Sequence, residues 1–74
     1  MDSRELTLGE KRVAYSYNPD QDEYIELVKR LHADIIDDLE EQREGASKER
    51  NRTILRAQTL AEDTCMLMVK QRFQ

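Results

Sequence analysis

The segment REGASKERNRT, from Arg43 to Thr53, carries a serine and several basic side chains where a helix is expected to begin. Ser47 is a suitable N-cap residue, and the first turn of a helix presents free backbone N–H groups and a partial positive charge. Ser47, Lys48 and Arg50 could therefore hold a phosphate group. The alternative is that the basic side chains form exposed ion pairs with acidic residues of the preceding segment, and such pairs contribute little stability.

Two tyrosines, Tyr15 and Tyr17, lie in the segment RVAYSY, ahead of the first long helical segment. Tyrosine rings can stack on nucleobases while nearby cations hold phosphates, which is the general scheme for binding single-stranded nucleotides. Lys29 or Arg30, near the start of the first long helix, would supply such a cation. The alternative is that the tyrosines anchor this segment to a neighbouring subunit.

A third group of side chains could bind a metal ion: His32, Asp34, Asp37, Asp38, Glu62 and Asp63. Carboxylates three or four positions apart on facing helices can bind Mg²⁺. We favour a simpler interpretation, a solvated acidic face that pairs with basic residues of the second helix, and predict neither a metal site nor a cofactor. Cys65 lies in an apolar stretch where burial makes a thiol unreactive, so we assign it to packing. With no nucleophile, base or metal cluster, the sequence predicts a protein that is not an enzyme.

Three helix breakers divide the chain into the elements that must position these side chains. They are Gly9, Pro19 and Gly45, and they predict a tail, an arm and two long helical segments. Residues 1–11 are expected to form a flexible tail, and residues 12–74 a single domain. Residues 12–17 alternate with a period of two, which predicts a short extended arm.

The first long helix is expected to run from about residue 20 to residue 43. Its N-cap is either Asn18, which Pro19 follows, or Asp20, with Glu23 three positions later. Gly45 would close this helix in a left-handed conformation, and Ser47 would begin the second helix. The predicted fold class is all-α, a two-helix antiparallel hairpin with a short extended N-terminal arm.

Apolar side chains cover more of both helices than one hairpin can bury. In the first helix they recur at helical spacing from Tyr24 to Leu39, and Ile25 and Ile36 widen the stripe. In the second helix the stretch CMLMV, residues 65–69, is apolar on every side. These side chains would face water in a single hairpin, so we expect a homo-oligomeric helical bundle.

Length and charge restrict the function. Seventy-four residues allow one small domain, near the lower size at which one chain can bury a sufficient core. Twelve Lys and Arg against sixteen Asp and Glu give a formal charge of −4, which argues against duplex DNA and anionic membranes as partners. One cysteine excludes an internal disulfide. Because the N-terminal residues also lack an apolar signal segment, we expect a cytoplasmic location.

The order of arm, helix, glycine-containing turn and helix is similar to that of ribbon-helix-helix repressors, and GASKERNRTI resembles the turn between their helices. Two features differ from that family. The first helix is roughly twice as long as such a fold uses, and the arm lacks the basic outward residues that read a major groove. A dimeric DNA-binding repressor is therefore the alternative function, together with a helical adaptor that inhibits a host protein.

A second pattern covers about residues 12 to 72. Its parts are YNP (Tyr17 to Pro19), Tyr24 with Leu27, SKER (Ser47 to Arg50), and then Ile54, Ala57, Leu60, Ala61, Leu67 and Met68. This pattern resembles the phage anti-CBASS sponge proteins, whose helical-hairpin domain is shared with a class of anti-Thoeris sponges. The chain differs from them where it reads EDTCM, since the family tends to carry Met-Trp-Ala-Asn there, and it lacks the Cys-Pro often found before the serine.

The resemblance implies a non-catalytic homo-oligomer, a hexamer, that binds cyclic di- or trinucleotide second messengers between its protomers. Binding would block CBASS-type immune signalling in the cytosol of an infected bacterium. For this function we predict that Tyr15 or Tyr17 stacks on a base and that Lys29 or Arg30 meets a phosphate. Ser47, Lys48 and Arg50 would form a second anion site.

Overall fold

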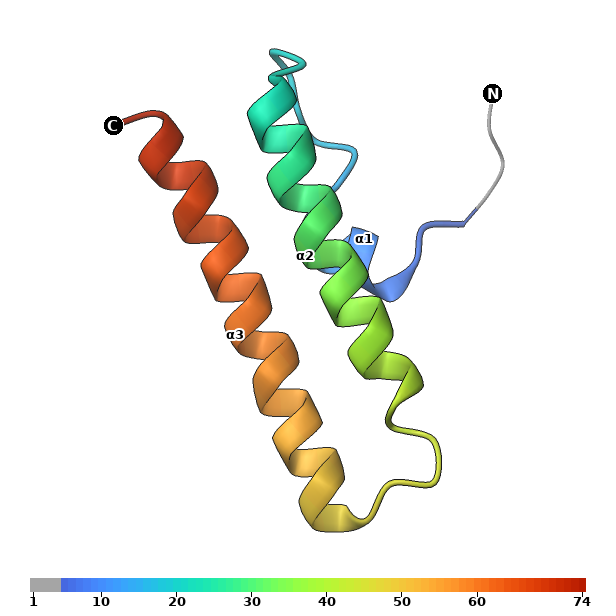
Figure 1. Ribbon diagram of the computed structural model, residues 1–74. Helices are drawn as coiled ribbons and strands as arrows, with labels where there is room; N and C mark the ends of the chain where they lie inside the picture. Colours follow the sequence, from blue (N-terminus) through green and yellow to red (C-terminus); the bar gives the residue numbers. More distant parts are fainter. Residues whose placement is uncertain (1–4) are drawn as a thin grey trace.

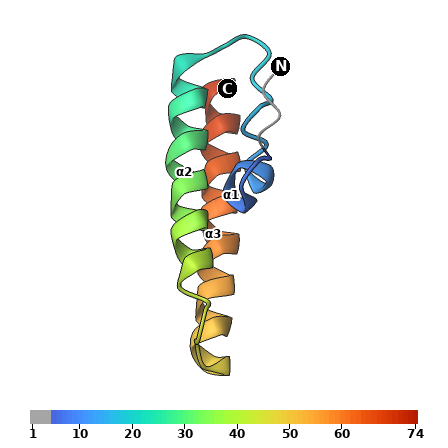
Figure 2. The same cartoon turned by 90° about the vertical axis from the view of Figure 1, so that its right-hand side faces the viewer.

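The computed structural model describes residues 5–74, which form three helices (Figure 1). Helix α1 spans Leu8–Arg12, α2 spans Glu23–Glu41 and α3 spans Lys48–Arg72. Helices α2 and α3 lie side by side and run in opposite directions, and α1 lies on one face of this pair (Figure 2). The all-α prediction is confirmed, because the described residues contain helices and no strand.

Helix α1 begins with a capping box formed by Thr7 and Glu10. Thr7 Oγ1 accepts a hydrogen bond from Glu10 N at 3.1 Å, and Glu10 Oε1 accepts one from Thr7 N at 2.8 Å. The exchange satisfies two N–H groups that the start of a helix otherwise leaves unpaired. We predicted a flexible tail over residues 1–11, but residues 8–11 belong to a helix that packs on α2. Residues 1–4 lie outside the described part.

The prediction of an extended arm over residues 12–17 is wrong. Residues 13–16 form turns after α1, with Ala14 at φ 52°. An extended arm would need a partner strand to bond its backbone groups. Here the side chain of Lys29 donates hydrogen bonds to the carbonyl oxygens of Ala14 and Tyr17. Of the alternating apolar residues, Val13 is buried and Tyr15 is partly buried, but Tyr17 is 69% exposed, so the pattern did not mark one buried face of a strand.

Helix α2 begins later than predicted, with Asp22 as its N-cap. Asp22 Oδ1 accepts a hydrogen bond from Tyr24 N at 2.9 Å, so both predicted caps, Asn18 and Asp20, are wrong. Asn18 instead bonds to the backbone of Asp22, accepting from its N–H at 3.1 Å and donating to its carbonyl oxygen at 3.0 Å. These bonds close a turn that contains Gln21 at φ 50°, and the helix starts only after it.

The connection between the two long helices has the predicted N-cap and the predicted left-handed glycine, but that glycine does not cap α2. Ser47 is the N-cap of α3, and its Oγ accepts a hydrogen bond from Arg50 N at 3.1 Å. Gly45 adopts φ +73°, a left-handed conformation that suits glycine. Helix α2 ends earlier than predicted, at Glu41, and Gln42 is its C-cap.

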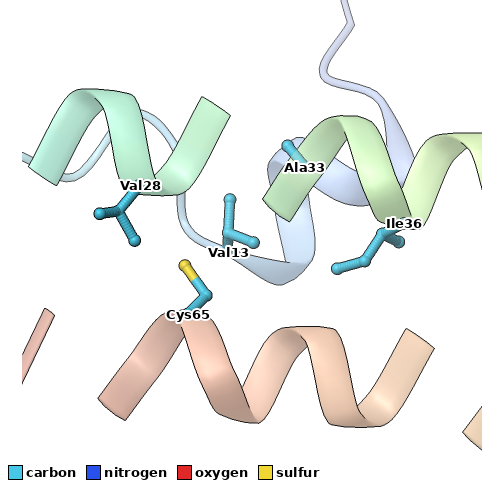
Figure 3. Packing of buried hydrophobic residues seen from close by; sticks show 5 residues of the cluster. All are labelled: Val13, Val28, Ala33, Ile36 and Cys65. Carbon is cyan, nitrogen blue, oxygen red and sulfur yellow. The ribbon is translucent and has the colours of Figure 1, made fainter. Parts of the chain in front are cut away.

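A small apolar core lies where the three helices meet (Figure 3). Its buried members are Val13, Val28, Ala33, Ile36 and Cys65. One follows α1, three lie on α2 and one on α3, so the core joins all three helices. Gly9 lies so close to the backbone of Ala33 that a Cβ there would overlap the Ala33 carbonyl oxygen. The close approach of α1 to α2 therefore requires glycine at this position.

Helices α2 and α3 form a single layer. The described residues measure 42 × 33 × 12 Å along their principal axes, so the fold is flat. Helix α1 and the turns that follow it lie on one face of the layer, and no other described segment covers the second face (Figures 1 and 2). Domains usually bury their apolar faces between two packed layers, so this layer has an apolar face left to cover.

Candidate functional site

Lys29 is a buried cation that makes no ion pair with a carboxylate within residues 5–74. Only 4% of this residue is exposed. Its Nζ donates hydrogen bonds to the carbonyl oxygens of Ala14 at 2.9 Å and Tyr17 at 2.5 Å. The same atom lies 5.5 Å from the centroid of the Tyr17 ring. These partners carry no net charge, so they stabilise the ammonium without neutralising it.

Burial disfavours the charged form of Lys29 and lowers its pKa below the ordinary value of 10.5. A buried charge is costly unless it is paired, and an anion beside Nζ would supply the missing pair. An ammonium group has three N–H donors. The two carbonyl oxygens use two of them, which leaves one for an anionic oxygen.

A hollow of about 170 Å³ opens beside Lys29 and Tyr17. Its lining includes two aromatic residues, Tyr17 and Phe73, and two aliphatic residues, Ile25 and Val69. Tyr17 is 69% exposed, so a free aromatic surface, an apolar wall and a buried cation meet at one place. These are the groups that proteins use to bind a nucleobase together with its phosphate.

Arg30 and Tyr15, the other predicted cation and ring, hold α1 against α2. Arg30 bonds through Nη1 to Glu10 Oε2 at 2.9 Å and through Nη2 to Asp34 Oδ1 at 2.8 Å. Its guanidinium also lies 4.8 Å from the centroid of the Tyr15 ring. Glu10 is buried, and its hydrogen bond together with that of Asp34 raises the pKa of Arg30. Because the charge of Arg30 is already paired, Tyr17 and Lys29 make the more open site.

The third predicted group, Ser47, Lys48 and Arg50, lies at the other end of the helix pair (Figure 1). All three side chains are exposed. Ser47 Oγ is used as the helix cap, and Arg50 Nη2 donates to Gln42 Oε1 at 3.3 Å. Within one chain, this group therefore lies far from Lys29. Ser47, Lys48 and Arg50 would form an anion site separate from the one at Lys29.

The acidic residues are dispersed, and no group of three or more ligands that could hold a metal ion occurs in the described part of the chain. His32 is buried, and its Nδ1 donates to a backbone carbonyl oxygen one turn earlier at 2.7 Å. Asp37 Oδ1 accepts from the N–H of Gly9 at 2.7 Å, and Glu62 pairs with Arg12 at 2.6 Å. These carboxylates tie α1 to α2 and α3.

Cys65 is fully buried in the core, beside Val13 and Val28 (Figure 3). Burial raises the pKa of its thiol above the ordinary 9.0. A thiol of this kind is a poor nucleophile. Its surroundings agree with the packing role predicted from the sequence.

The face of the layer turned away from α1 carries exposed apolar side chains, and we call it the open face. Its members are Leu31, Ile35, Leu60 and Leu67, which are 46% to 63% exposed. The contacts with α1 lie on the other side, because Gly9 meets α2 at Ala33 and Arg12 meets α3 at Glu62. Ala33 follows Leu31 by two positions, and Glu62 follows Leu60 by two positions. Two positions turn a side chain by about 200° around a helix, so these leucines point away from α1.

Sequence reasoning missed Phe73 and the turn from Asn18 to Asp22 as parts of a site. The signal for the turn was present, because Asn-Pro-Asp is typical of turns, but it was assigned to the start of the helix. Phe73 follows the last helical residue, and only the pairing of α2 with α3 brings it beside Tyr17.

Within residues 5–74, no helix combines the length and the apolar character that a membrane span requires. No family model, curated protein or solved structure matches this chain.

Proposed function

We propose that this protein binds cyclic di- or trinucleotides and holds them without cleaving them, as a homo-oligomer. In an infected bacterium this sequestration would lower the free concentration of a second messenger and so block CBASS-type immune signalling. The likeness to anti-CBASS sponges noted in the sequence supplies the ligand class and implies a hexamer.

The observation that carries the proposal is the buried ammonium of Lys29 beside the exposed ring of Tyr17. A cation that is 4% exposed and has only neutral hydrogen-bond acceptors is stabilised by an anion. The adjacent ring is a stacking surface for a planar group. A cyclic dinucleotide joins these two features in one molecule, since each base lies a few bonds from a phosphate.

The hollow of one chain is too small for the whole ligand. It measures about 170 Å³, whereas sites for drug-sized ligands usually measure roughly 300 to 1,000 Å³. One protomer would therefore hold one base and one phosphate, and the remainder of the ligand would contact a second protomer. The proposed site is thus at a subunit interface.

The open face supports self-association through a surface on the other side of the layer from the turn that follows α1 (Figure 2). The protomer that completes the ligand site would therefore contact the α1 side, in a second interface. Four large apolar side chains of α2 and α3 are 46% to 63% exposed there, and covering them with a partner would remove apolar surface from water. A second copy of the chain would supply the missing layer and cover this face with an identical apolar surface. The oligomeric helical-hairpin bundle expected from the sequence is proposed on this basis.

The two alternative functions have less support. A ribbon-helix-helix repressor pairs extended arms, whereas residues 13–16 form turns here and the formal charge is −4. An adaptor that inhibits a host protein would use the open face without needing Lys29 or Tyr17. A variant that loses ligand binding but keeps its assembly therefore separates an adaptor from the proposed function.

Titration calorimetry with cyclic di-AMP, cyclic di-GMP, cyclic GMP-AMP and cyclic tri-AMP tests the proposal directly. We expect tight binding of at least one of these ligands, which is then recovered intact after the protein is denatured. Absence of binding to all four overturns the proposal. Recovery of a linear product shows an enzyme instead.

Two variants assign the binding to this site. Tyr17→Ala should weaken binding about 5- to 100-fold, while Tyr17→Phe keeps the ring and most of the affinity. Lys29→Met should weaken binding as well, and circular dichroism shows whether the helices still fold. Lys11→Met, which changes an exposed lysine of α1, is the matched control and should bind like the wild type.

A further inference from the structure

Phe73 has the features of a binding residue although it follows the end of α3. Its side chain is 65% exposed, and it lines the same hollow as Tyr17. An exposed phenylalanine on its own needs no explanation. Two exposed aromatic rings at one hollow, beside a buried cation, are a more specific combination.

We infer that this hollow is a subsite for one nucleobase, with Tyr17 as one aromatic wall and Phe73 as the other. The inference rests on the proposed function, because it identifies which part of the cyclic nucleotide enters the hollow. It also adds a binding residue from the end of α3 to the residues of the N-terminal turn.

The size of the hollow suits one ring system. A volume of about 170 Å³ is the volume that about five or six water molecules occupy in the liquid, at roughly 30 Å³ each. Pro19, Ile25 and Val69 make the rest of the wall largely apolar. Such a space favours a flat, uncharged group, while Lys29 at its edge favours the phosphate attached to that group.

The polar groups of the lining leave the base to be held chiefly by stacking. The side chain of Asn18 is already bonded to the backbone of Asp22 through both its oxygen and its nitrogen. Asp20 is exposed and offers only acceptor oxygens, which suit the amino group of adenine or guanine. Stacking tolerates different bases, so the subsite should accept either purine.

The end of α3 is held in place beside the hollow. Arg72 bonds to Asp22 at 2.9 Å, and its guanidinium lies 5.1 Å from the centroid of the Tyr24 ring. Gln71 Nε2 donates to the hydroxyl oxygen of Tyr24 at 3.0 Å. These contacts fix the residues next to Phe73 before any ligand binds, and a wall that is already in place costs less to order on binding.

Fluorescence titration tests the subsite, with a cyclic di-AMP in which 2-aminopurine replaces one adenine as the probe. Stacking quenches 2-aminopurine. We expect the wild-type protein to quench the probe, and Phe73→Ala to bind about 5- to 100-fold more weakly with part of the fluorescence recovered. Phe73→Leu should lose quenching in the same way, and Phe73→Trp should retain it. Leu55→Ala, an exposed apolar truncation elsewhere on α3, should match the wild type.

Two results separate this inference from the proposed function. If Tyr17→Ala weakens binding and quenching while Phe73→Ala changes neither, the hollow has one aromatic wall and the inference is wrong. If the wild type binds no cyclic nucleotide, the proposed function is wrong, and 2-aminopurine riboside 5′-monophosphate then tests the subsite alone. Quenching of this smaller probe that depends on both rings supports a base subsite, and its absence overturns it.

Discussion

The backbone N–H of Gly9 donates a 2.7 Å hydrogen bond to the carboxylate of Asp37, across 28 positions of the chain. This bond joins the first turn of α1 to the second half of α2. Together with the ion pairs of Glu10 with Arg30 and of Arg12 with Glu62, it fixes α1 on the layer. The turn that carries Tyr17 follows directly, so the position of the candidate site depends on the docking of α1.

Gly9→Ala should undock α1. The added Cβ would overlap the backbone of Ala33, and overpacking of this kind costs about 1 to 3 kcal/mol of unfolding free energy. Urea denaturation measures the loss, and hydrogen exchange should show faster exchange in α1 than in α2 and α3. Gly45→Ala is the comparison, because it meets no neighbouring atom and costs only its left-handed backbone, about 1 kcal/mol. Uniform exchange throughout the Gly9→Ala protein would show that α1 and the helix pair unfold together.

Asp22→Asn should reduce the sensitivity of the fold to acid. The hydrogen bond from Arg72 holds the pKa of Asp22 below its ordinary value of 3.8. The folded state therefore binds this proton less readily than the unfolded state, so the stabilisation is present above pH 3.8 and is lost as the pH falls through the folded pKa. Asparagine keeps the helix cap but cannot pair with Arg72.

Urea midpoints of the wild type and Asp22→Asn at pH 6 and pH 2.5 test this prediction. The variant should be less stable at pH 6, and the difference between the two proteins should be smaller at pH 2.5. Asp20→Asn, which removes an exposed carboxylate two positions earlier, should follow the wild type at both values. A difference between Asp22→Asn and the wild type that is the same at both pH values would show that the ion pair is not its cause.

Leu31→Glu and Leu60→Glu should each disrupt the proposed assembly. Both leucines lie on the open face and are about half exposed, so a charge there would be buried unpaired between copies. Light scattering should report a smaller particle while circular dichroism remains helical. Leu55→Glu is the matched control, since Leu55 lies two turns before Glu62 and so on the α1 side of α3. If all three variants keep the wild-type mass, the open face is not the interface between copies.

Lys48→Glu combined with Arg50→Glu tests the second anion site. Both side chains are exposed and Ser47 keeps the helix cap, so folding and assembly should be retained. Calorimetry should show weaker binding of at least one cyclic nucleotide, because two positive charges near a helix start become negative. Unchanged binding of every ligand by an intact assembly would leave the group as surface charge.

The sequence was informative wherever one local interaction decides the conformation. Ser47 was predicted in its observed role, since an N-cap depends on residues only a few positions away. The left-handed conformation of Gly45 was also predicted, but not its place in the loop, because Gln42 and not Gly45 caps α2. The packing role of Cys65 followed from its apolar neighbours in the sequence. The all-α class likewise followed from helical spacing of apolar residues over two long segments.

The tertiary structure decided what depends on distant residues. The sequence predicted that residues 12–17 are extended. In the structure Lys29 donates hydrogen bonds to two carbonyl oxygens of that segment, which stabilise it as turns. Sequence reasoning treated Lys29 and Arg30 alike, yet Arg30 reaches the carboxylates of Glu10 and Asp34 while Lys29 is buried among neutral groups. Adjacent positions on a helix point about 100° apart, so which of the two cations remained without an ion pair depended on where α1 packed.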